Sequence, residues 1–228
     1  MFLKDILFPK ICVCCSYLGS YICFNCQKKL KYIEQEICFI CKKPSPFGLI
    51  HFSCKKKYHP EGIMSIFYYN NVLKNIIKTV KYHLAIEVFK ELFQVINSKK
   101  IEKISFFANF KNVVFQPIPL YQNREKQRGF NQAKILISFF YNFLPFSEID
   151  CLIRKKETKP QAEIKSRRDR YLNVKNAFSV KPQVEIDENK VIILVDDVIT
   201  TGMTVLEAVK TLKKAGFKKV FVLSLARA

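Results

Sequence analysis

The cysteines constrain this chain more than any other feature, because eight of the nine lie before residue 55 of a 228-residue sequence. Three pairs have the C-x-x-C spacing, namely Cys12/Cys15, Cys23/Cys26 and Cys38/Cys41. Two intervening residues let the chain turn so that both thiolates face one ion, and two such pairs complete a tetrahedral zinc site. The spacing therefore predicts a small zinc-ribbon-like module over residues 1–60.

The three pairs supply more ligands than one zinc ion needs. One site can be formed by Cys12, Cys15, Cys23 and Cys26. The third pair needs two further ligands, and His51 and Cys54 repeat the two-residue gap, which predicts a second site of Cys38, Cys41, His51 and Cys54. The spacing alone does not decide which pairs combine, so we expect structural Zn²⁺ as one or two ions.

Two other uses of paired cysteines compete with zinc. Disulfides persist mainly in oxidising compartments, and the N-terminus is a poor secretion signal because Lys4 and Asp5 interrupt its apolar stretch. Redox C-x-x-C motifs usually occur singly beside a βαβ pattern. A cytoplasmic zinc protein is therefore favoured. Cys14 could compete with its neighbours but is expected to be a spectator, and Cys151 is expected to be a buried core thiol.

Beyond residue 60 the hydrophobic pattern alternates between strands and helices. Strands are predicted over 62–69, 112–119, 149–153, 191–195 and 219–225. Helices are predicted over 72–80 and 84–97, in a segment with apolar residues at 135, 136, 139, 140 and 143, and over 203–214. Asn131 is expected to cap the third of these helices, and the polar stretch 121–130 is interpreted as a loop. This alternation predicts an α/β domain with a parallel sheet over residues 61–228.

Several functional classes are excluded by what the sequence lacks. No apolar run reaches the roughly 18 residues of a membrane-spanning helix. Neither the G-x-x-x-x-G-K-[ST] phosphate loop nor the G-x-G-x-x-G dinucleotide fingerprint occurs.

The stretch 191–205, VIILVDDVITTGMTV, carries the most chemical information. A continuous apolar strand ends in Asp196 and Asp197, and a Thr-Thr-Gly turn then leads into a helix. Backbone N–H groups at such a turn and helix start bind phosphate, and Gly202 allows close approach of the backbone. Carboxylates beside them can accept hydrogen bonds from a sugar diol, so the pattern indicates a ribose 5-phosphate site. In the simpler alternative, Asp197 or Thr200 is only a helix cap.

These residues resemble the phosphoribosyl-pyrophosphate (PRPP) motif of type I phosphoribosyltransferases. The wider chain resembles the ComF/ComFC family of competence proteins, which combine a zinc-binding N-terminus with a phosphoribosyltransferase domain. The matching pieces are the paired cysteines, Pro117-Ile118-Pro119, Arg128-Gly129-Phe130-Asn131-Gln132, and Lys159 to Phe178 with Gln161, Arg168 and Asn173. The chain differs at His51, where the family usually has cysteine.

The resemblance implies a role for each matched residue. Asp196 and Asp197 would hold the ribose hydroxyls. The loop Pro119–Arg128 would approach the pyrophosphate with Mg²⁺, and Arg128 is its implied PRPP-binding residue. The 5-phosphate would be bound by Thr200, Thr201, Gly202, Met203 and Thr204. Residues 155–168 resemble the mobile loop of these enzymes. The implied catalytic residues are Lys159, Arg168, Asp196 and Asp197. Lys159 and Arg168, with Lys155 and Lys156, would neutralise the charge on the leaving pyrophosphate. Alternatively, each basic side chain is an ordinary solvated surface charge.

The resemblance further implies a cytoplasmic protein that binds PRPP and handles incoming single-stranded DNA in natural transformation. Partners would include single-stranded DNA and a competence helicase or other DNA-processing proteins, and association with the inner face of the membrane stays open. A net charge of +20 fits an anionic partner, although a Lys-rich chain can simply be basic. Phosphoribosyltransferase activity is left open, and the alternative is an enzyme of nucleotide metabolism acting on an unidentified base or amine.

Overall fold

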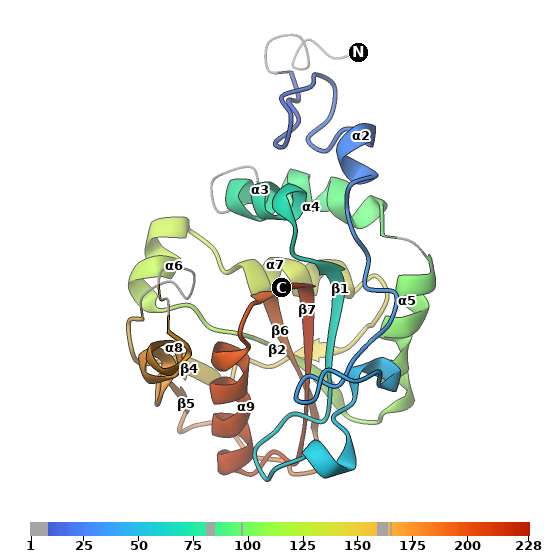
Figure 1. The fold of residues 1–228 in the computed structure, drawn as a ribbon. Coiled ribbons are helices and arrows are strands. Elements are labelled where there is room, and N and C mark those ends of the chain that lie inside the picture. Colours follow the sequence, from blue (N-terminus) through green and yellow to red (C-terminus); the bar gives the residue numbers. More distant parts are fainter. Residues whose placement is uncertain (1–8, 81–84, 97, 159–163, 165) are drawn as a thin grey trace.

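A five-stranded parallel sheet forms the centre of the protein, here described from a computed structural model (Figure 1). The structure describes residues 9–80, 85–96, 98–158, 164 and 166–228. The strands are β1 (Ile63–Tyr68), β2 (Val113–Pro117), β3 (Ser147–Glu148), β6 (Val191–Ile199) and β7 (Lys219–Arg227). Their order in the sheet is β1-β7-β6-β2-β3, and every pair is parallel. The carboxyl ends of all five strands therefore lie at one edge.

The helices and the remaining strands surround this sheet. The α-helices are α2 (Phe24–Gln27), α3 (Asn71–Val80), α4 (Ala85–Gln94), α5 (Ser98–Ile104), α6 (Gln122–Arg128), α7 (Gln132–Phe140), α8 (Arg167–Val174) and α9 (Met203–Ala215). Three 3₁₀ turns are η1 (Pro46–Gly48), η2 (Phe52–Cys54) and η3 (Ser105–Asn109). A separate antiparallel pair joins β4 (Leu152–Arg154) and β5 (Phe178–Val180).

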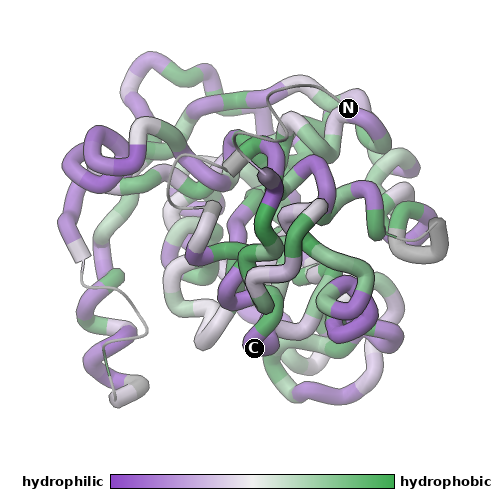
Figure 2. The backbone as a smooth tube through the Cα atoms, turned by 90° about the horizontal axis from the view of Figure 1, so that it is seen from above, coloured by the Kyte–Doolittle hydropathy of each residue, from purple (hydrophilic) through white to green (hydrophobic). Residues whose placement is uncertain are grey.

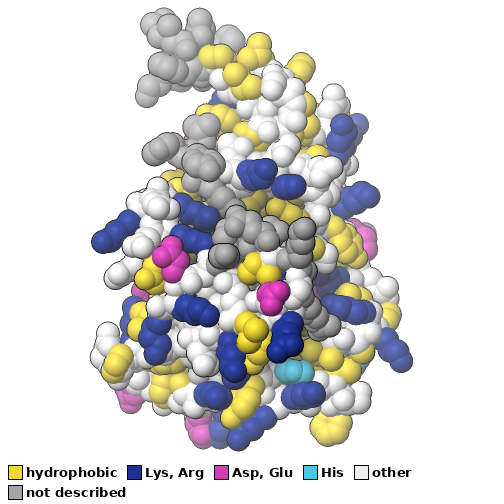
Figure 3. Space-filling view, turned by 60° about the vertical axis from the view of Figure 1, so that its left-hand side comes forward, with side chains coloured by type: hydrophobic (Ala, Val, Ile, Leu, Met, Phe, Trp, Pro, Cys, Tyr) yellow, Lys and Arg dark blue, Asp and Glu magenta, His cyan; other side chains and the backbone are white. Residues whose placement is uncertain are grey.

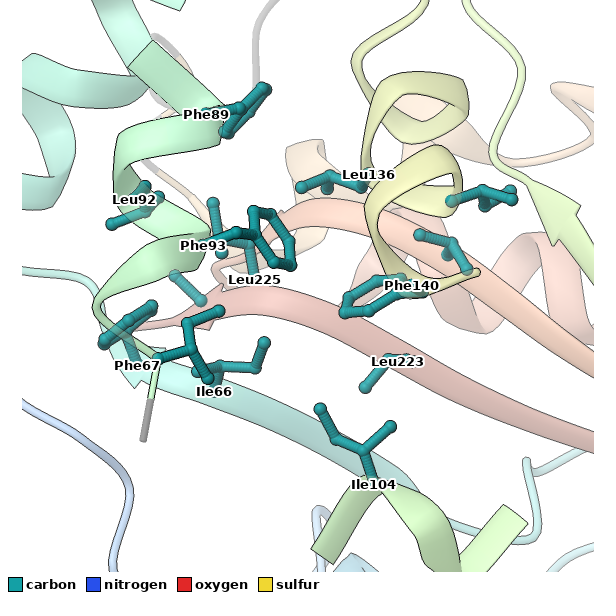
Figure 4. Close-up of a cluster of buried hydrophobic side chains, with 14 of the residues drawn as sticks. Ile66, Phe67, Phe89, Leu92, Phe93, Ile104, Leu136, Phe140, Leu223 and Leu225 are labelled. Atoms are coloured by element: carbon teal, nitrogen blue, oxygen red, sulfur yellow. The ribbon is translucent and has the colours of Figure 1, made fainter. Parts of the chain in front are cut away.

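The sheet is covered on both faces, which explains why β6 begins with five consecutive buried apolar residues. Alternate side chains of its strands enter two hydrophobic clusters. On one face, Phe115, Ile193 and Leu223 pack with α3, α4, α5 and α7. Figure 4 shows this cluster, with Phe93 of α4 and Phe140 of α7 pointing toward one another above the strands.

On the opposite face, α9 packs with the alternate residues of the same strands, among them Ile192 and Leu194. The β4–β5 pair belongs to this face through Leu152 and Phe178. Seen from above, the apolar strands occupy the centre of the molecule and hydrophilic segments lie around them (Figure 2).

The cysteine-rich segment runs along the molecule instead of folding away from it. Its first part lies against α3 and α4, and the chain then descends beside β1, where Tyr32 bridges to Phe67 (Figure 1). Its last part reaches the sheet again, because the Glu61 N–H donates to the Val220 carbonyl at 2.8 Å. Cys12, Cys23 and Cys26 are buried in the same cluster as the sheet residues. The division at residue 60 stays a prediction.

The predicted α/β class and parallel sheet are confirmed, as are the strand centred on 191–195 and the Asn131 cap, whose side chain accepts the Ala133 N–H. The loop expected over 121–130 was wrong, because Gln122–Arg128 is helix α6. Gly129, at φ 76°, ends this helix and donates its N–H to the Glu125 carbonyl. Among the described helices, none has the length and apolarity needed to span a bilayer.

Candidate functional site

A cavity of about 500 Å³ opens at the carboxyl ends of the strands, where parallel sheets bind ligands. Its walls come from six described elements and the loops between them. The lining residues are Tyr69, Ile77, Ile118, Leu120, Arg124, Gln127, Arg128, Asn131, Gln132, Ala133, Arg154 and the run 196–205. Its volume falls within the range of roughly 300–1,000 Å³ for small-molecule sites.

The run from β6 into α9 forms one wall of this cavity. Asp196 and Asp197 are the sixth and seventh residues of β6, and the backbone then turns through Gly202 at φ 74°. Gly202 is the N-cap of α9, and no side chain caps this helix. The alternative that Asp197 or Thr200 is merely a cap is therefore not supported. The first N–H groups of a 13-residue helix face the cavity and can receive an anion.

Two arginines line the cavity next to Thr158. The Arg124 and Arg154 guanidinium groups donate to the carbonyl and the hydroxyl of Thr158, respectively. Arg154 also lies over the Phe178 ring, 5.4 Å from its centroid. The packing of the β4–β5 pair thus fixes a cation beside the acidic end of β6. Arg128 lies on the same wall and donates to Gln132 Oε1 at 3.1 Å.

The charges in the cavity perturb one another. Burial and the Asp197 charge raise the pKa of Asp196 well above its ordinary value, while the Arg154 charge opposes the rise. Burial and the nearby Arg124 charge lower the pKa of Arg154 to about 10, and Asp196 opposes that change. Burial and Asp197 also raise the pKa of Tyr69. Perturbed groups that converge in a cavity are typical of a functional site.

Three buried polar atoms lack a hydrogen-bond partner within the described part of the chain. They are Gln132 Nε2, Arg154 Nε and Thr201 Oγ1. All three residues line the same cavity. Leaving a buried polar group unpaired costs about 1–3 kcal/mol, so a coincidence of three at one place indicates a polar ligand.

The structure brings most of the predicted PRPP residues together. Arg128, Asp196, Asp197, Thr200, Thr201, Gly202, Met203 and Thr204 all line the cavity. Arg168 does not line the cavity and is exposed on α8. Lys159 lies outside the described residues. Which roles these residues have stays a prediction.

Sequence reasoning missed Arg154 and Tyr69. Arg154 is the last residue of β4 and Tyr69 directly follows β1, and neither belongs to a local motif. Only the perturbed charge environment, which needs the folded structure, identifies them.

The first predicted metal group is assembled near the N-terminus. The sulfurs of Cys12, Cys15, Cys23 and Cys26 lie within 4.8 Å of one another. Burial raises the pKa of the Cys12 thiol, but N–H groups of Cys23, Cys14 and Cys15 outweigh burial and lower it to about 6. A thiolate favoured in this way suits a metal ion. Cys14 is outside the group, and its thiol donates to the Val72 carbonyl.

The second group is also assembled as predicted. Ligand atoms of Cys38, Cys41, His51 and Cys54 lie within 4.8 Å of one another. His51 Nδ1 is 3.2 Å from Cys41 Sγ, and its Nε2 lies 3.1 Å from the Pro44 carbonyl, which orients the ring. Both groups could hold a structural metal ion. Cys151 is fully buried and its thiol donates to Gln116 Oε1, which confirms a core thiol.

Comparison with known proteins places the cavity in a wider context. The phosphoribosyl transferase domain family matches residues 127–228. The chain is 29% identical to competence protein F of Haemophilus influenzae, covering 91% of this chain and 90% of that protein. It is 29% identical to competence protein ComFC of Bacillus subtilis, covering 86% and 79%. It is 26% identical to the DNA utilization protein YhgH of Escherichia coli K12, covering 96% and 97%.

Proposed function

Because this chain belongs to the ComF/ComFC family, we propose that it binds PRPP in the cavity at the end of β6 and acts in natural transformation. The 5-phosphate would lie on the turn and helix start at 200–204, and the ribose hydroxyls would donate to Asp196 and Asp197. Arg124 and Arg154 face the remaining volume, where the pyrophosphate would be neutralised.

The observation that carries this proposal is the set of unpaired polar atoms in the cavity. Thr201 Oγ1 can donate to a phosphate oxygen, and Arg154 Nε can donate to a pyrophosphate oxygen. PRPP, whose phosphate and pyrophosphate are both anionic, would satisfy these donors and complement the uncapped start of α9. An apolar ligand would leave all of them unpaired.

The family and the ligand atoms also support two metals. Zn²⁺ would occupy the two cysteine groups, whose four-ligand composition fits a closed structural site. Mg²⁺ would accompany PRPP, held by its pyrophosphate oxygens together with a carboxylate at the end of β6.

Single-stranded DNA and DNA-processing proteins, such as a competence helicase, are the macromolecular partners we propose. The names of the relatives refer to competence and DNA utilization. Lys and Arg side chains are spread over the face shown in Figure 3, with few acidic side chains among them, which fits an anionic partner.

Calorimetry with PRPP and Mg²⁺ tests the ligand assignment. We expect unmodified protein to bind, and Asp196→Ala or Asp197→Ala to weaken binding by about 1.5–3 kcal/mol per lost charged hydrogen bond. Asp187→Ala is the matched control, because this carboxylate precedes β6 and lies outside the cavity lining. No heat of binding to the unmodified protein would contradict the proposal, as would equal losses in all three variants.

A phosphoribosyltransferase enzyme of nucleotide metabolism is the second candidate. A neighbouring cavity of about 610 Å³ shares Leu120, Asn131 and Arg154 with the first and could admit an acceptor. The acceptor lone pair would bond to ribose C1 as the C1–O bond to pyrophosphate breaks, and the acceptor proton would pass to solvent. Release of pyrophosphate on addition of a base or amine would favour this candidate.

A further inference from the structure

The second cysteine group contacts the turn that we assign to phosphate binding. A Cβ built on Gly202 would lie 2.3 Å from Phe39 Cζ and 2.9 Å from its Cε1. The Phe39 ring therefore lies directly on the backbone of the N-cap of α9. Phe39 does not line the cavity, so the ring supports the turn from outside the space left for a ligand.

The position of the ring is fixed by the metal group itself. Phe39 stands between Cys38 and Cys41, and this turn is closed by hydrogen bonds from the Lys42 N–H to the Cys38 carbonyl and from the Cys38 N–H to the Lys43 carbonyl. A metal ion bound by both cysteines would hold the turn in one conformation. The Lys42 ammonium covers the ring, 4.1 Å from its centroid.

Two ion pairs tie this group to the elements that carry the turn. Glu36 and Arg227 pair at 3.5 Å with both side chains nearly buried, and Arg227 is the register partner of Ile199 at the end of β6. On the other side of the group, Glu61 pairs with Lys213 in the last turn of α9 at 2.8 Å. The segments that flank the group are thus tied to β7 beside the carboxyl end of β6 and to the last turn of α9.

We propose that Phe39 is a positioning residue for the turn at 200–204, and that the metal group Cys38, Cys41, His51 and Cys54 acts through it to order the phosphate subsite. This inference rests on the proposed function for the identity of the ligand. It assigns the second metal group a part in ligand binding, whereas the first group, packed on α3 and α4, contacts none of the described residues of the turn.

The chain contains its own matched control. Phe24 follows the first cysteine of the Cys23/Cys26 pair, as Phe39 follows the first cysteine of the Cys38/Cys41 pair. Each ring is covered by a lysine, since Lys28 lies 4.2 Å from the Phe24 centroid. Phe24, however, is 66% exposed and touches no part of the cavity. Phe24→Ala and Phe39→Ala therefore remove the same side chain from the same kind of turn.

The experiment measures PRPP affinity by calorimetry and backbone hydrogen exchange across 199–206 in the full chain. We expect Phe39→Ala to raise the dissociation constant about three- to tenfold, the range expected when a loop must be ordered on binding. Exchange across the turn should become faster in the free protein. Phe24→Ala should change neither quantity, and Phe39→Leu, which keeps an apolar side chain on Gly202, should stay within about twofold of the unmodified protein.

Zinc analysis accompanies each variant, so that loss of the ion is separated from loss of the ring. Unchanged affinity and exchange in Phe39→Ala would overturn the inference, and so would equal effects of Phe24→Ala. If the unmodified protein does not bind PRPP, the ligand assignment fails. The hydrogen-exchange measurement alone then tests whether Phe39 positions the turn. Faster exchange at the turn in Phe39→Ala, but not in Phe24→Ala, then still supports positioning by Phe39, and unchanged exchange overturns it.

Discussion

The ionised side chain of Asp196 lowers the stability of the folded protein. It lies at the half-buried end of β6 beside a second carboxylate, with Arg154 as the nearby opposing charge. Its own side chain accepts the Asp197 N–H at 2.9 Å, which orients the carboxylate along the strand end. A raised pKa at such a position is characteristic of a group kept for a ligand and not for the fold.

The pH dependence of stability tests this view of Asp196. Because its pKa is raised, the folded state holds the proton more tightly than the unfolded chain, and stability falls as pH rises from about 4 through the raised value. Asp196→Asn has no proton to lose. We expect this variant to melt at a higher temperature than the unmodified protein at pH 8, and the difference to shrink as pH falls toward about 4. Thermal melts between pH 4 and pH 8 measure it.

Asp187 is the comparison for Asp196, because its contribution to stability depends on pH in the opposite direction. Hydrogen bonds from the Asn189 N–H and the Asn112 amide lower its pKa, so its contribution to stability is present above its ordinary pKa and is lost as pH falls. Asp187→Asn should therefore melt below the unmodified protein at pH 8. If both variants shift in the same direction, the raised pKa of Asp196 is not the cause.

Some residues of the cavity could be predicted from the sequence, and others could not. The run from Asp196 to Thr204 was found because its members are consecutive and a strand, turn and helix are each visible in the pattern. Arg154 was not found, since it enters the cavity from a three-residue strand in a second sheet. Phe39 lies 163 positions before Gly202 in the chain, and no local signal connects them.

Among the elements, those buried in the sheet were predictable and those at the surface were not. The apolar runs of β6 and β7 and the periodicity of α9 identified them directly. Helix α6 has no buried residue, so its seven polar side chains indicated a loop. The strand expected over 149–153 overlaps only the first two residues of β4, and β3 ends just before residue 149. The chain leaves the five-stranded sheet between β3 and β4, so two short strands replace the single one expected.

The two metal groups should be separable. Changing Cys23 and Cys26 to Ser removes two ligands of the first group, and structural zinc contributes on the order of 10 kcal/mol in small modules. We expect the variant to contain one zinc ion where the unmodified protein contains two, measured by mass spectrometry of the metal. Hydrogen exchange should increase over residues 9–30, while the parallel sheet stays protected.

PRPP binding is the internal control for that variant. It should be retained, because the first group packs on α3 and α4 through Cys14 and Ile22, away from the turn at 200–204. An unmodified protein without zinc, or with disulfides among these cysteines, would contradict the metal assignment. Loss of the whole sheet in the variant would mean that residues 1–60 are not a separable module.

At the scale of the whole molecule, the charge of +20 exceeds what one PRPP molecule can balance. Basic and aromatic side chains occur together at the surface, for example on α8, where Arg168 and Tyr171 are three residues apart and both exposed. Single strands bind to such surfaces because bases stack on rings while phosphates meet cations. The sequence identified this basic stretch, but only the structure shows that part of it is a helix with an exposed ring.

Single-stranded DNA binding should therefore be weak, tolerant of sequence and sensitive to salt. Four to six phosphate contacts correspond to a slope of log affinity against log salt of about −3 to −4, at about 0.7 per phosphate. Changing Arg167, Arg168 and Arg170 on α8 to Ala should flatten that slope by about 2. Fluorescence anisotropy with a labelled oligonucleotide, titrated at several salt concentrations, gives both affinity and slope.

The control removes the same charge from the other end of the sheet. Lys190 directly precedes β6, Lys218 directly precedes β7, and Lys219 is the first residue of β7. Their replacement by Ala should leave the slope nearly unchanged if α8 is the binding surface. If the slope flattens equally in both triple variants, DNA affinity depends only on the net charge of the protein and not on a particular surface. An unmodified protein that does not bind DNA near 50 mM salt would show that the positive charge serves another partner, since phosphate contacts are strongest at low salt.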